Sequence, residues 1–145
     1  MTRDRTRTLR GADVAAGDAL PPFELPVTST VIVAGAIASR DFMPAHHDAV
    51  FARAQGAPDM FMNILTTNGY VARFVSDWAG PEAMIRRIAI RLGAPAVPGQ
   101  SLHFSGEVSQ VTAEDDAYRL EVAVRAANDL GDHATGTVTL TLPRD

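Results

Sequence analysis

The segment from Met60 to Trp78 constrains the fold more than any other part of the chain. Its apolar residues recur three or four positions apart and cover much of a helix circumference: Phe61, Ile64, Leu65, Val71, Ala72, Phe74 and Val75. A helix this apolar is buried against a sheet instead of lying on a surface. Gly69 lowers helix propensity, which predicts that a sheet approaches the helix closely there. Gly80-Pro81 ends the helix.

The chain after this helix predicts strands joined by short turns. Four segments are rich in alternating apolar and polar residues: 84–92, 101–111, 118–128 and 133–142. Turn residues separate them, with Pro98-Gly99 before the second segment and Gly131 before the last. Strands joined by such short turns pair in an antiparallel sheet.

The region before the helix is less regular. Residues 1–27 contain three prolines between positions 21 and 26 and are expected to form a loosely ordered lead-in. Residues 28–38 are β-branched and small, which predicts a strand buried on both faces. A short helix is then expected from Pro44 to about Ala54, with its end near Gln55-Gly56.

Together these elements predict one domain of the α+β class. A long apolar helix wrapped by an antiparallel sheet is a hotdog fold, and residues 28–145 would form it as a single domain. A length of 145 residues is enough for one substantial core. A single sheet of this kind leaves an edge strand and one face uncovered, so pairing with another hotdog domain is expected.

Composition excludes several kinds of chemistry. The chain has no Cys, and its 13 basic residues are all Arg, which rules out thiol nucleophiles, disulfides, Schiff bases and a P-loop lysine. A net charge of −4 argues against nucleic acid as the main partner. No apolar run approaches a membrane span, and the Arg-rich start has no apolar signal region behind it. A cytoplasmic protein is therefore expected.

The candidate site is the decapeptide from Ser39 to Asp48. Pro44 suits the first position of a helix, which puts His46 in the first turn and Asp41 just outside it. An Asp and a His on either side of such a corner can hold one water, with one group accepting a proton and the other supplying one. The alternative is structural: Asp41 ends the strand, Asp48 complements the helix start, and His46 packs inside. The decapeptide alone leaves both interpretations open.

The same decapeptide resembles a family signature. The MaoC-like hotdog family, which includes (R)-specific enoyl-CoA hydratases, carries S-x-D-F-N-P-x-H-x-D at a strand-to-helix corner. The residues in the same spacing here are Ser39, Asp41, Phe42, Pro44, His46 and Asp48. The chain is more similar to one branch, the small MaoC-like subunits of heteromeric hydratases in actinobacterial steroid side-chain degradation. This likeness runs from about residue 28 to 142 and includes Asp77-Trp78-Ala79-Gly80-Pro81.

The resemblance implies a reaction and its residues. Asp41 and His46 would form a catalytic dyad that hydrates a 2-enoyl-CoA, either with Asp41 as the base for water and His46 as partner and proton donor, or with these two roles exchanged or shared. The acyl group would be bulky and steroid-derived, coenzyme A would be part of the substrate, and no cofactor or metal would be required. The backbone N–H groups of Met62 and Asn63 would receive the thioester oxygen at the start of the long helix. Met62-Asn63 stands where the broad family has His-Gly, so the added Asn side chain predicts a different pocket.

The resemblance also implies a partner. A larger MaoC-like subunit would complete an α2β2-type heteromer, and the chain alone would form a homodimer. Arg86, Arg87 and Arg91 are candidate contacts for the phosphates of coenzyme A, or else part of a solvated strand face.

The remaining histidines are expected outside the dyad. His47 is adjacent to His46 in a helix and so faces another way, which favours a structural or interface role. His103 and His133 fall opposite the apolar sets of their strands, so both are expected at the surface or at an interface.

Three other functions stay open at this point. A dehydratase of 3-hydroxyacyl groups, on coenzyme A or on acyl carrier protein, would use the same dyad in reverse. A non-catalytic hotdog subunit would only support a partner's site, and an intact Asp41/His46 pair argues against it. A thioesterase is the weakest of the three, because hotdog thioesterases place their carboxylates differently.

Overall fold

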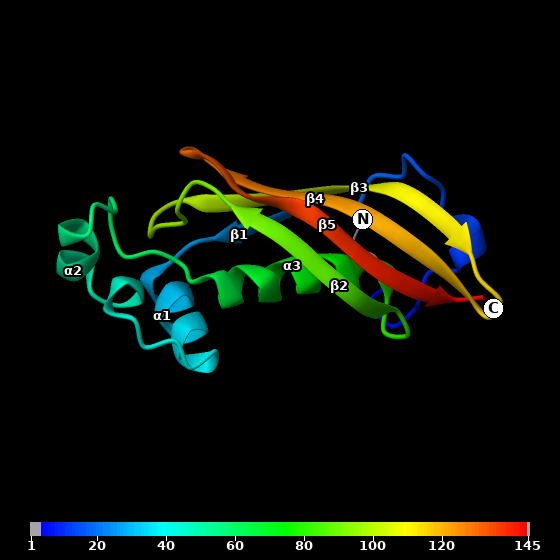
Figure 1. Ribbon diagram of the computed structural model, residues 1–145, viewed down its shortest axis with the longest axis horizontal. Coiled ribbons are helices and arrows are strands. Elements are labelled where there is room, and N and C mark those ends of the chain that lie inside the picture. Colours follow the sequence, from blue (N-terminus) through cyan, green and yellow to red (C-terminus); the bar gives the residue numbers. More distant parts are fainter. Residues whose placement is uncertain (1–3, 145) are drawn as a thin grey trace.

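The structure is a computed structural model that describes residues 4–144. Its centre is a five-stranded antiparallel sheet in the order β1-β3-β4-β5-β2, curved around one helix (Figure 1). The strands are β1 (Phe23–Pro26), β2 (Met84–Leu92), β3 (Ser101–Ala113), β4 (Ala117–Asn128) and β5 (Gly131–Pro143). The helices are α1 (Ser29–Ala38), α2 (Ala49–Ala54) and α3 (Ile64–Ala79), with 3-10 turns η1 (Gly11–Asp13) and η2 (Pro44–His46). Within residues 4–144, no helix is long and apolar enough to cross a membrane.

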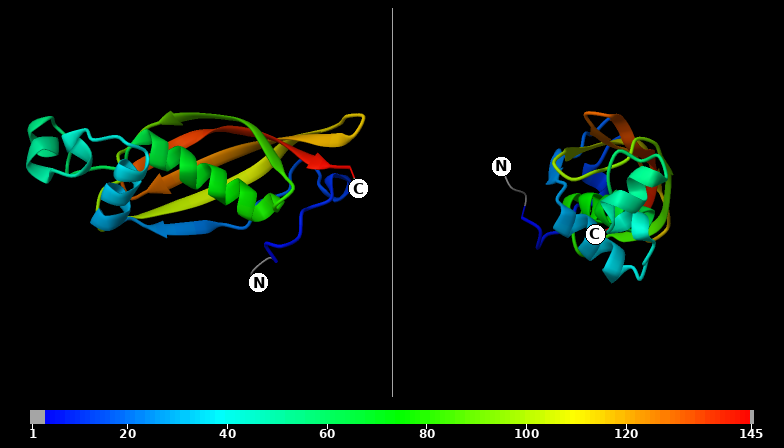
Figure 2. Two further views of the ribbon diagram at one scale, coloured as in Figure 1. Left: turned by 90° about the horizontal axis from the view of Figure 1, so that it is seen from below. Right: turned by 90° about the vertical axis from the view of Figure 1, so that its left-hand side faces the viewer.

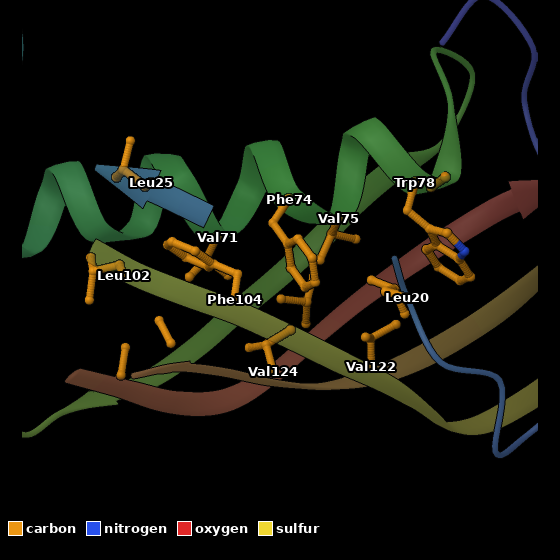
Figure 3. Close-up of a cluster of buried hydrophobic side chains, with 14 of the residues drawn as sticks. Leu20, Leu25, Val71, Phe74, Val75, Trp78, Leu102, Phe104, Val122 and Val124 are labelled. Atoms are coloured by element: carbon orange, nitrogen blue, oxygen red, sulfur yellow. The ribbon is translucent and has the colours of Figure 1, made fainter. Parts of the chain in front are cut away.

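Helix α3 is the predicted central helix, and it lies along the hollow of the sheet (Figure 2). Its sheet-facing side is apolar and gathers with side chains of β3 and β4 in one core (Figure 3): Val71, Phe74, Val75 and Trp78 with Leu102, Phe104, Val122 and Val124. Burying a side chain of this size completely stabilises the fold by about 1.5–3 kcal/mol. These contacts confirm the hotdog fold and the α+β class.

The four late strands lie where alternation predicts them, although β3 and β5 extend a few residues further. Leu120 and Val122 of β4 point into the core and are fully buried, whereas Arg119 and Arg125 on the other face are exposed. β4 pairs with both β3 and β5 through short hairpins. β2 lies beside β5 at one edge of the sheet.

Residues 29–38, predicted as a strand, form helix α1 instead. Thr28 caps this helix, because its hydroxyl accepts a hydrogen bond from the N–H of Val31 at 3.1 Å. Ile32 and Ala36, four positions apart, are its buried residues, which is helical spacing. A short run of apolar residues offers no polar positions to reveal its period, so alternation could not separate helix from strand.

The loosely ordered lead-in predicted for residues 1–27 is wrong for its second half. β1 pairs with β3, with Leu25 opposite Leu102, and Val14, Leu20 and Val27 are buried in the core. Prolines argued against a strand here, but β1 is an edge strand, where proline is tolerated. The packed domain therefore begins well before residue 28. Residues 1–3 lie outside the described part of the chain.

The short helix predicted from Pro44 to Ala54 is divided into η2 and α2. Asp48 causes the division, because its Oδ1 caps α2 by accepting from the N–H groups of Val50 (2.9 Å) and Phe51 (3.1 Å). Gly56 follows the helix with a φ of 93°, a conformation that favours glycine. α2 lies beyond the end of the sheet, so this segment overhangs the rest of the domain (Figure 1).

The predicted close approach of the sheet to Gly69 is wrong. A Cβ at this position would have no atom within 4 Å. Gly69 instead lines an open groove between α1 and α3, together with Gly35, Ala38, Leu65 and Tyr70. This side of α3 is therefore left uncovered by residues 4–144 along the groove.

Candidate active site

The chain reverses direction directly after α1, at residues 39–41. The hydroxyl of Ser39 donates to the carbonyl of Gly35 (2.7 Å), and the N–H of Asp41 donates to the carbonyl of Ala36 (2.9 Å). Arg40 between them has a φ of 57°, a left-handed conformation that is uncommon outside glycine. These bonds fix the backbone of Asp41 against the end of α1.

Asp41 and His46 meet across this corner. Nε2 of His46 lies 3.3 Å from Oδ2 of Asp41. The imidazole is buried and packs edge-on against the ring of Phe61. Its Nδ1 lies 2.7 Å from the carbonyl oxygen of Phe61, and since a carbonyl oxygen only accepts, Nδ1 must carry a hydrogen. Nε2 is therefore the nitrogen that faces Asp41.

The side chain of Asn63 joins Asp41 to the start of α3. Its Nδ2 donates to Oδ2 of Asp41 (3.0 Å) and to Oγ of Ser39 (2.9 Å). Its Oδ1 caps α3 by accepting from the N–H of Thr66 (3.1 Å). The sequence predicted that this side chain alters the pocket, but not that it holds the carboxylate 22 positions earlier.

These contacts lower the pKa of the Asp41 carboxyl. The hydrogen bond from Asn63 is the largest cause, and the second is the bond from the N–H of Met43, 3.3 Å from Oδ1. Desolvation opposes both, and the nearby His46 adds a smaller lowering. Asp41 is consequently a carboxylate at neutral pH.

A carboxylate oxygen and an imidazole nitrogen 3.3 Å apart can contact one water molecule together. One group can then accept a proton while the other supplies one. The pair borders a cleft of about 320 Å³, whose other lining residues are Phe61, Met62, Asn63, Ile64, Leu92, Gly93, Ala94, Pro95 and His133. Most of these residues are apolar, which fits an apolar group bound beside a polar reacting centre.

The prediction of two backbone donors for a substrate oxygen is wrong for Met62. Its N–H donates to the carbonyl of Ala96 (2.9 Å), so this group is already engaged. The N–H of Asn63 has no partner within residues 4–144, and it lies at the positive end of a 16-residue helix. Of the two predicted donors, Asn63 alone remains a candidate.

The three arginines of β2 lie at different distances from the cleft. All are exposed, and β2 is an edge strand. Arg91 directly precedes Leu92, which lines the cleft, whereas Arg86 and Arg87 lie about 13–17 Å farther along the strand at its usual rise. Arg86 also donates from Nε to Oγ1 of Thr141 (3.2 Å). Arg91 is therefore the best placed of the three for a ligand in the cleft.

His133 does not lie at the surface of this chain, as the alternation of its strand suggested. It is 2% exposed, and it lines the cleft. In the ladder between β4 and β5, Ala134 pairs with Ala126 and Asp132 with Ala127, so His133 is the extra residue of a bulge. A bulge re-aims a side chain relative to the regular alternation. By contrast, His103 and His47 are exposed.

Known proteins resemble this chain over most of its length. The family model described as a MaoC like domain matches residues 15–129. The chain is 48% identical over 126 residues to the 3-oxo-4,17-pregnadiene-20-carboxyl-CoA hydratase beta subunit of Mycobacterium tuberculosis. That alignment covers 87% of this chain and 95% of the relative.

Solved structures share the fold. A chain in the crystal structure of the ChsH1–ChsH2 complex from Mycobacterium tuberculosis matches with a TM-score of 0.82 and 45% identity, over 88% of this chain and 98% of that one. The R-hydratase PhaJ1 from Pseudomonas aeruginosa matches with a TM-score of 0.85 over 97% of this chain and 89% of that one, but its 18% identity shows the fold alone. Because the family model spans residues 15–129 and the curated relative is 48% identical over most of the chain, this protein belongs to the MaoC-like domain family.

Proposed function

We propose that this chain is the catalytic subunit of a hydratase that adds water to a bulky 2-enoyl-CoA, with Asp41 and His46 as the catalytic pair. One observation carries the proposal: Oδ2 of Asp41 and Nε2 of His46 lie 3.3 Å apart at the edge of a cleft. A further hydrogen bond orients each side chain: Asp41 accepts one from Asn63, and His46 donates one to the carbonyl of Phe61. The relative at 48% identity is named a carboxyl-CoA hydratase subunit, which supports a steroid side-chain acyl group as the substrate.

The reaction can be written on these two side chains. Asp41 takes a proton from water as the water oxygen bonds to Cβ of the enoyl group. The electrons of the double bond move toward the thioester carbonyl, and Nε2–H of protonated His46 supplies the proton that Cα receives. Proton transfer from Asp41 to His46, across 3.3 Å, then restores both groups. The thioester bond stays intact, so coenzyme A is part of the substrate and no further cofactor takes part.

The enolate oxygen that develops in this reaction requires hydrogen-bond donors. We assign this role to the backbone N–H of Asn63, at the N-terminus of α3. Arg91, beside the cleft, is the first candidate for contact with the phosphates of coenzyme A, and Arg86 and Arg87 are more distant candidates. A cytoplasmic location is part of the same proposal.

We further propose that the chain works with a larger MaoC-like subunit in an α2β2-type heteromer. The relative is named a beta subunit, and the 45% identical structure is that of a complex. Large apolar side chains on α1, the following corner and the start of α3 are exposed by 47–67%: Ile37, Phe42, Met43, Ile64 and Leu65. Apolar surface of this kind is typical of a protein contact. The chain alone would form a homodimer with little activity.

Co-expression with a larger MaoC-like protein tests both parts of the proposal. The co-purified pair should elute as an α2β2-type complex and hydrate a steroid 2-enoyl-CoA, measured as loss of the enoyl thioester absorbance. The isolated chain should elute as a smaller oligomer with little activity. Full activity of the isolated chain would contradict the heteromer, and a complex that hydrates no enoyl-CoA would contradict the reaction.

The same geometry serves the reverse reaction, so dehydration of a 3-hydroxyacyl group is the second candidate function. The group that acts as the base in hydration acts as the acid in dehydration, and the other group changes role in the same way. Parallel assays of one acyl group on coenzyme A and on acyl carrier protein separate the two carriers. A purely supporting role for this chain predicts that Asp41 and His46 substitutions leave the complex fully active.

A further inference from the structure

The ring of His133 is built into the wall of the cleft, outside the catalytic pair. Its Nδ1 lies 2.7 Å from the carbonyl oxygen of Ala94, and its Nε2 lies 2.8 Å from Oγ1 of Thr67. Nδ1 must carry the hydrogen, because a carbonyl oxygen only accepts. Burial lowers the pKa of His133, which favours the neutral ring, so Nε2 accepts from the hydroxyl of Thr67.

The loop between β2 and β3 is held at three successive carbonyl groups. Their donors come from three different parts of the chain: His133 for Ala94 (2.7 Å), Nδ2 of Asn128 for Pro95 (3.0 Å), and the N–H of Met62 for Ala96 (2.9 Å). Pro95 also restricts the backbone of the residue before it. The loop therefore cannot shift without losing bonds to more than one element.

The bond at Ala96 connects this loop to the catalytic pair. Met62 directly follows Phe61, whose carbonyl accepts from Nδ1 of His46 (2.7 Å). The two-residue segment is thus held by the loop on one side and contacts the imidazole of His46 on the other. A displaced loop would move the carbonyl of Phe61, and with it the ring that faces Asp41.

We propose that His133 is a positioning residue for the hydration reaction, which fixes the loop through Ala94 and, through that loop, the orientation of His46. This inference rests on the proposed function and adds a residue to it. The bond that matters for His46 is the donation from Nδ1 to Ala94. The bond from Thr67 holds the ring of His133 in the orientation that makes this donation.

Two substitutions that both introduce a carboxamide distinguish the roles of the two ring nitrogens of His133. The amide of Asn is bonded to Cγ, as Nδ1 is in His, whereas the amide of Gln lies one bond farther out, as Nε2 does. His133→Asn thus keeps a donor for Ala94, and His133→Gln keeps a partner for Thr67 only. In the assembled complex, kcat should stay within about threefold of wild type for His133→Asn and fall about 10–100-fold for His133→Gln, with a smaller change in KM. The same two changes at exposed His103 are controls and should leave kcat unchanged.

A spectroscopic readout follows His46 itself, independently of activity. ¹⁵N spectra of the full chain with labelled histidine report whether Nδ1 of His46 carries a fixed hydrogen. At a pH high enough for the His46 ring to be neutral, the wild type and His133→Asn should show this hydrogen, and His133→Gln should show a mixture of the Nδ1–H and Nε2–H tautomers. Asn128→Ala releases the neighbouring carbonyl of Pro95 and should produce the same mixed state, which keeps the test decisive if a His133 variant does not fold.

The outcomes separate this inference from the proposed function. Equal kcat for His133→Asn and His133→Gln, or an unchanged His46 spectrum in His133→Gln and Asn128→Ala, overturns the positioning role and leaves the reaction intact. Normal turnover after substitution of His46 overturns the proposed function, while the spectra still report whether His133 orients that ring.

Discussion

Nδ2 of Asn63 lies 3.0 Å from Oδ2 of Asp41, and the same side chain caps α3 through its Oδ1. One residue therefore connects the carboxylate of the candidate pair to the start of the central helix. A change at Asn63 acts on two quantities, the stability of the helix end and the pKa of Asp41. The two effects can be separated, because other side chains can provide the cap without providing a donor for the carboxylate.

Asn63→Ser should keep the cap and remove the donor to Asp41. The pKa of Asp41 is lowered in the folded wild type, mainly by Asn63, so loss of this bond raises it toward the ordinary value. The acid limb of the kcat/KM profile of the complex should then move to higher pH. Asn63→Ala should show the same shift and also lose about 1 kcal/mol of stability in urea unfolding, because the cap is absent. Superimposable acid limbs for Asn63→Ser and wild type would exclude Asn63 as the group that keeps Asp41 ionised.

Substitution of either member of the pair should lower kcat strongly. Asp41→Asn removes the base while keeping the shape, and His46→Asn removes Nε2 while keeping a donor for the carbonyl of Phe61. Each should reduce kcat of the complex roughly 100-fold or more, as expected for lost acid–base catalysis. His47→Ala, at the exposed neighbour, is the control and should retain activity. Near-normal turnover in folded Asp41→Asn or His46→Asn would remove that residue from the mechanism.

The lowered pKa of His133 should make folding stability depend on pH. The unfolded chain binds a proton at this residue near the ordinary pKa of 6.5, whereas burial delays protonation of the folded chain to lower pH. The unfolded state binds more protons in that window, so stability falls as the pH decreases from about 6.5 through the folded pKa. The urea midpoint should depend less on pH in His133→Asn than in wild type. His103→Asn is the control and should keep the wild-type slope; an equal slope in His133→Asn would contradict the assignment.

Gly69→Ala should have opposite effects on the isolated chain and on the heteromer. Alanine in a helix interior is more favourable than glycine by about 0.5–1 kcal/mol, and the added Cβ has no atom within 4 Å, so urea unfolding of the chain alone should shift upward. The same methyl group enters the groove between α1 and α3, which shares Leu65 with the apolar surface proposed for the partner, and should weaken association, measured by titration calorimetry. Gly35→Ala is the contrast, because its Cβ would collide with Thr66 and destabilise the chain itself. Unchanged association of Gly69→Ala would place the partner elsewhere.

Helices and strands whose apolar residues recur with a regular period could be predicted from the sequence. Helix α3 and the four strands after it each bury one side, so the period of their apolar residues reports both the element and its inward face. α1 shows the limit of this signal: its residues 31–38 contain no polar or charged side chain, and without polar positions the period does not distinguish a helix from a strand. β1 shows another limit, since it is short and becomes a strand by pairing with β3.

For the candidate site, local sequence was enough to bring the pair together at one corner, because Asp41 and His46 are close in the chain and Pro44 shapes the turn between them. The groups that surround this pair come from distant parts of the chain and depend on the folded structure. Asn63 bonds Asp41 across 22 positions, and Thr67 bonds His133 across 66. The N–H of Met62 is taken by Ala96, and a bulge turns His133 into the cleft. Local patterns reflect the preferences of neighbouring residues, whereas these bonds depend on which distant groups the curved sheet and α3 bring within hydrogen-bond distance.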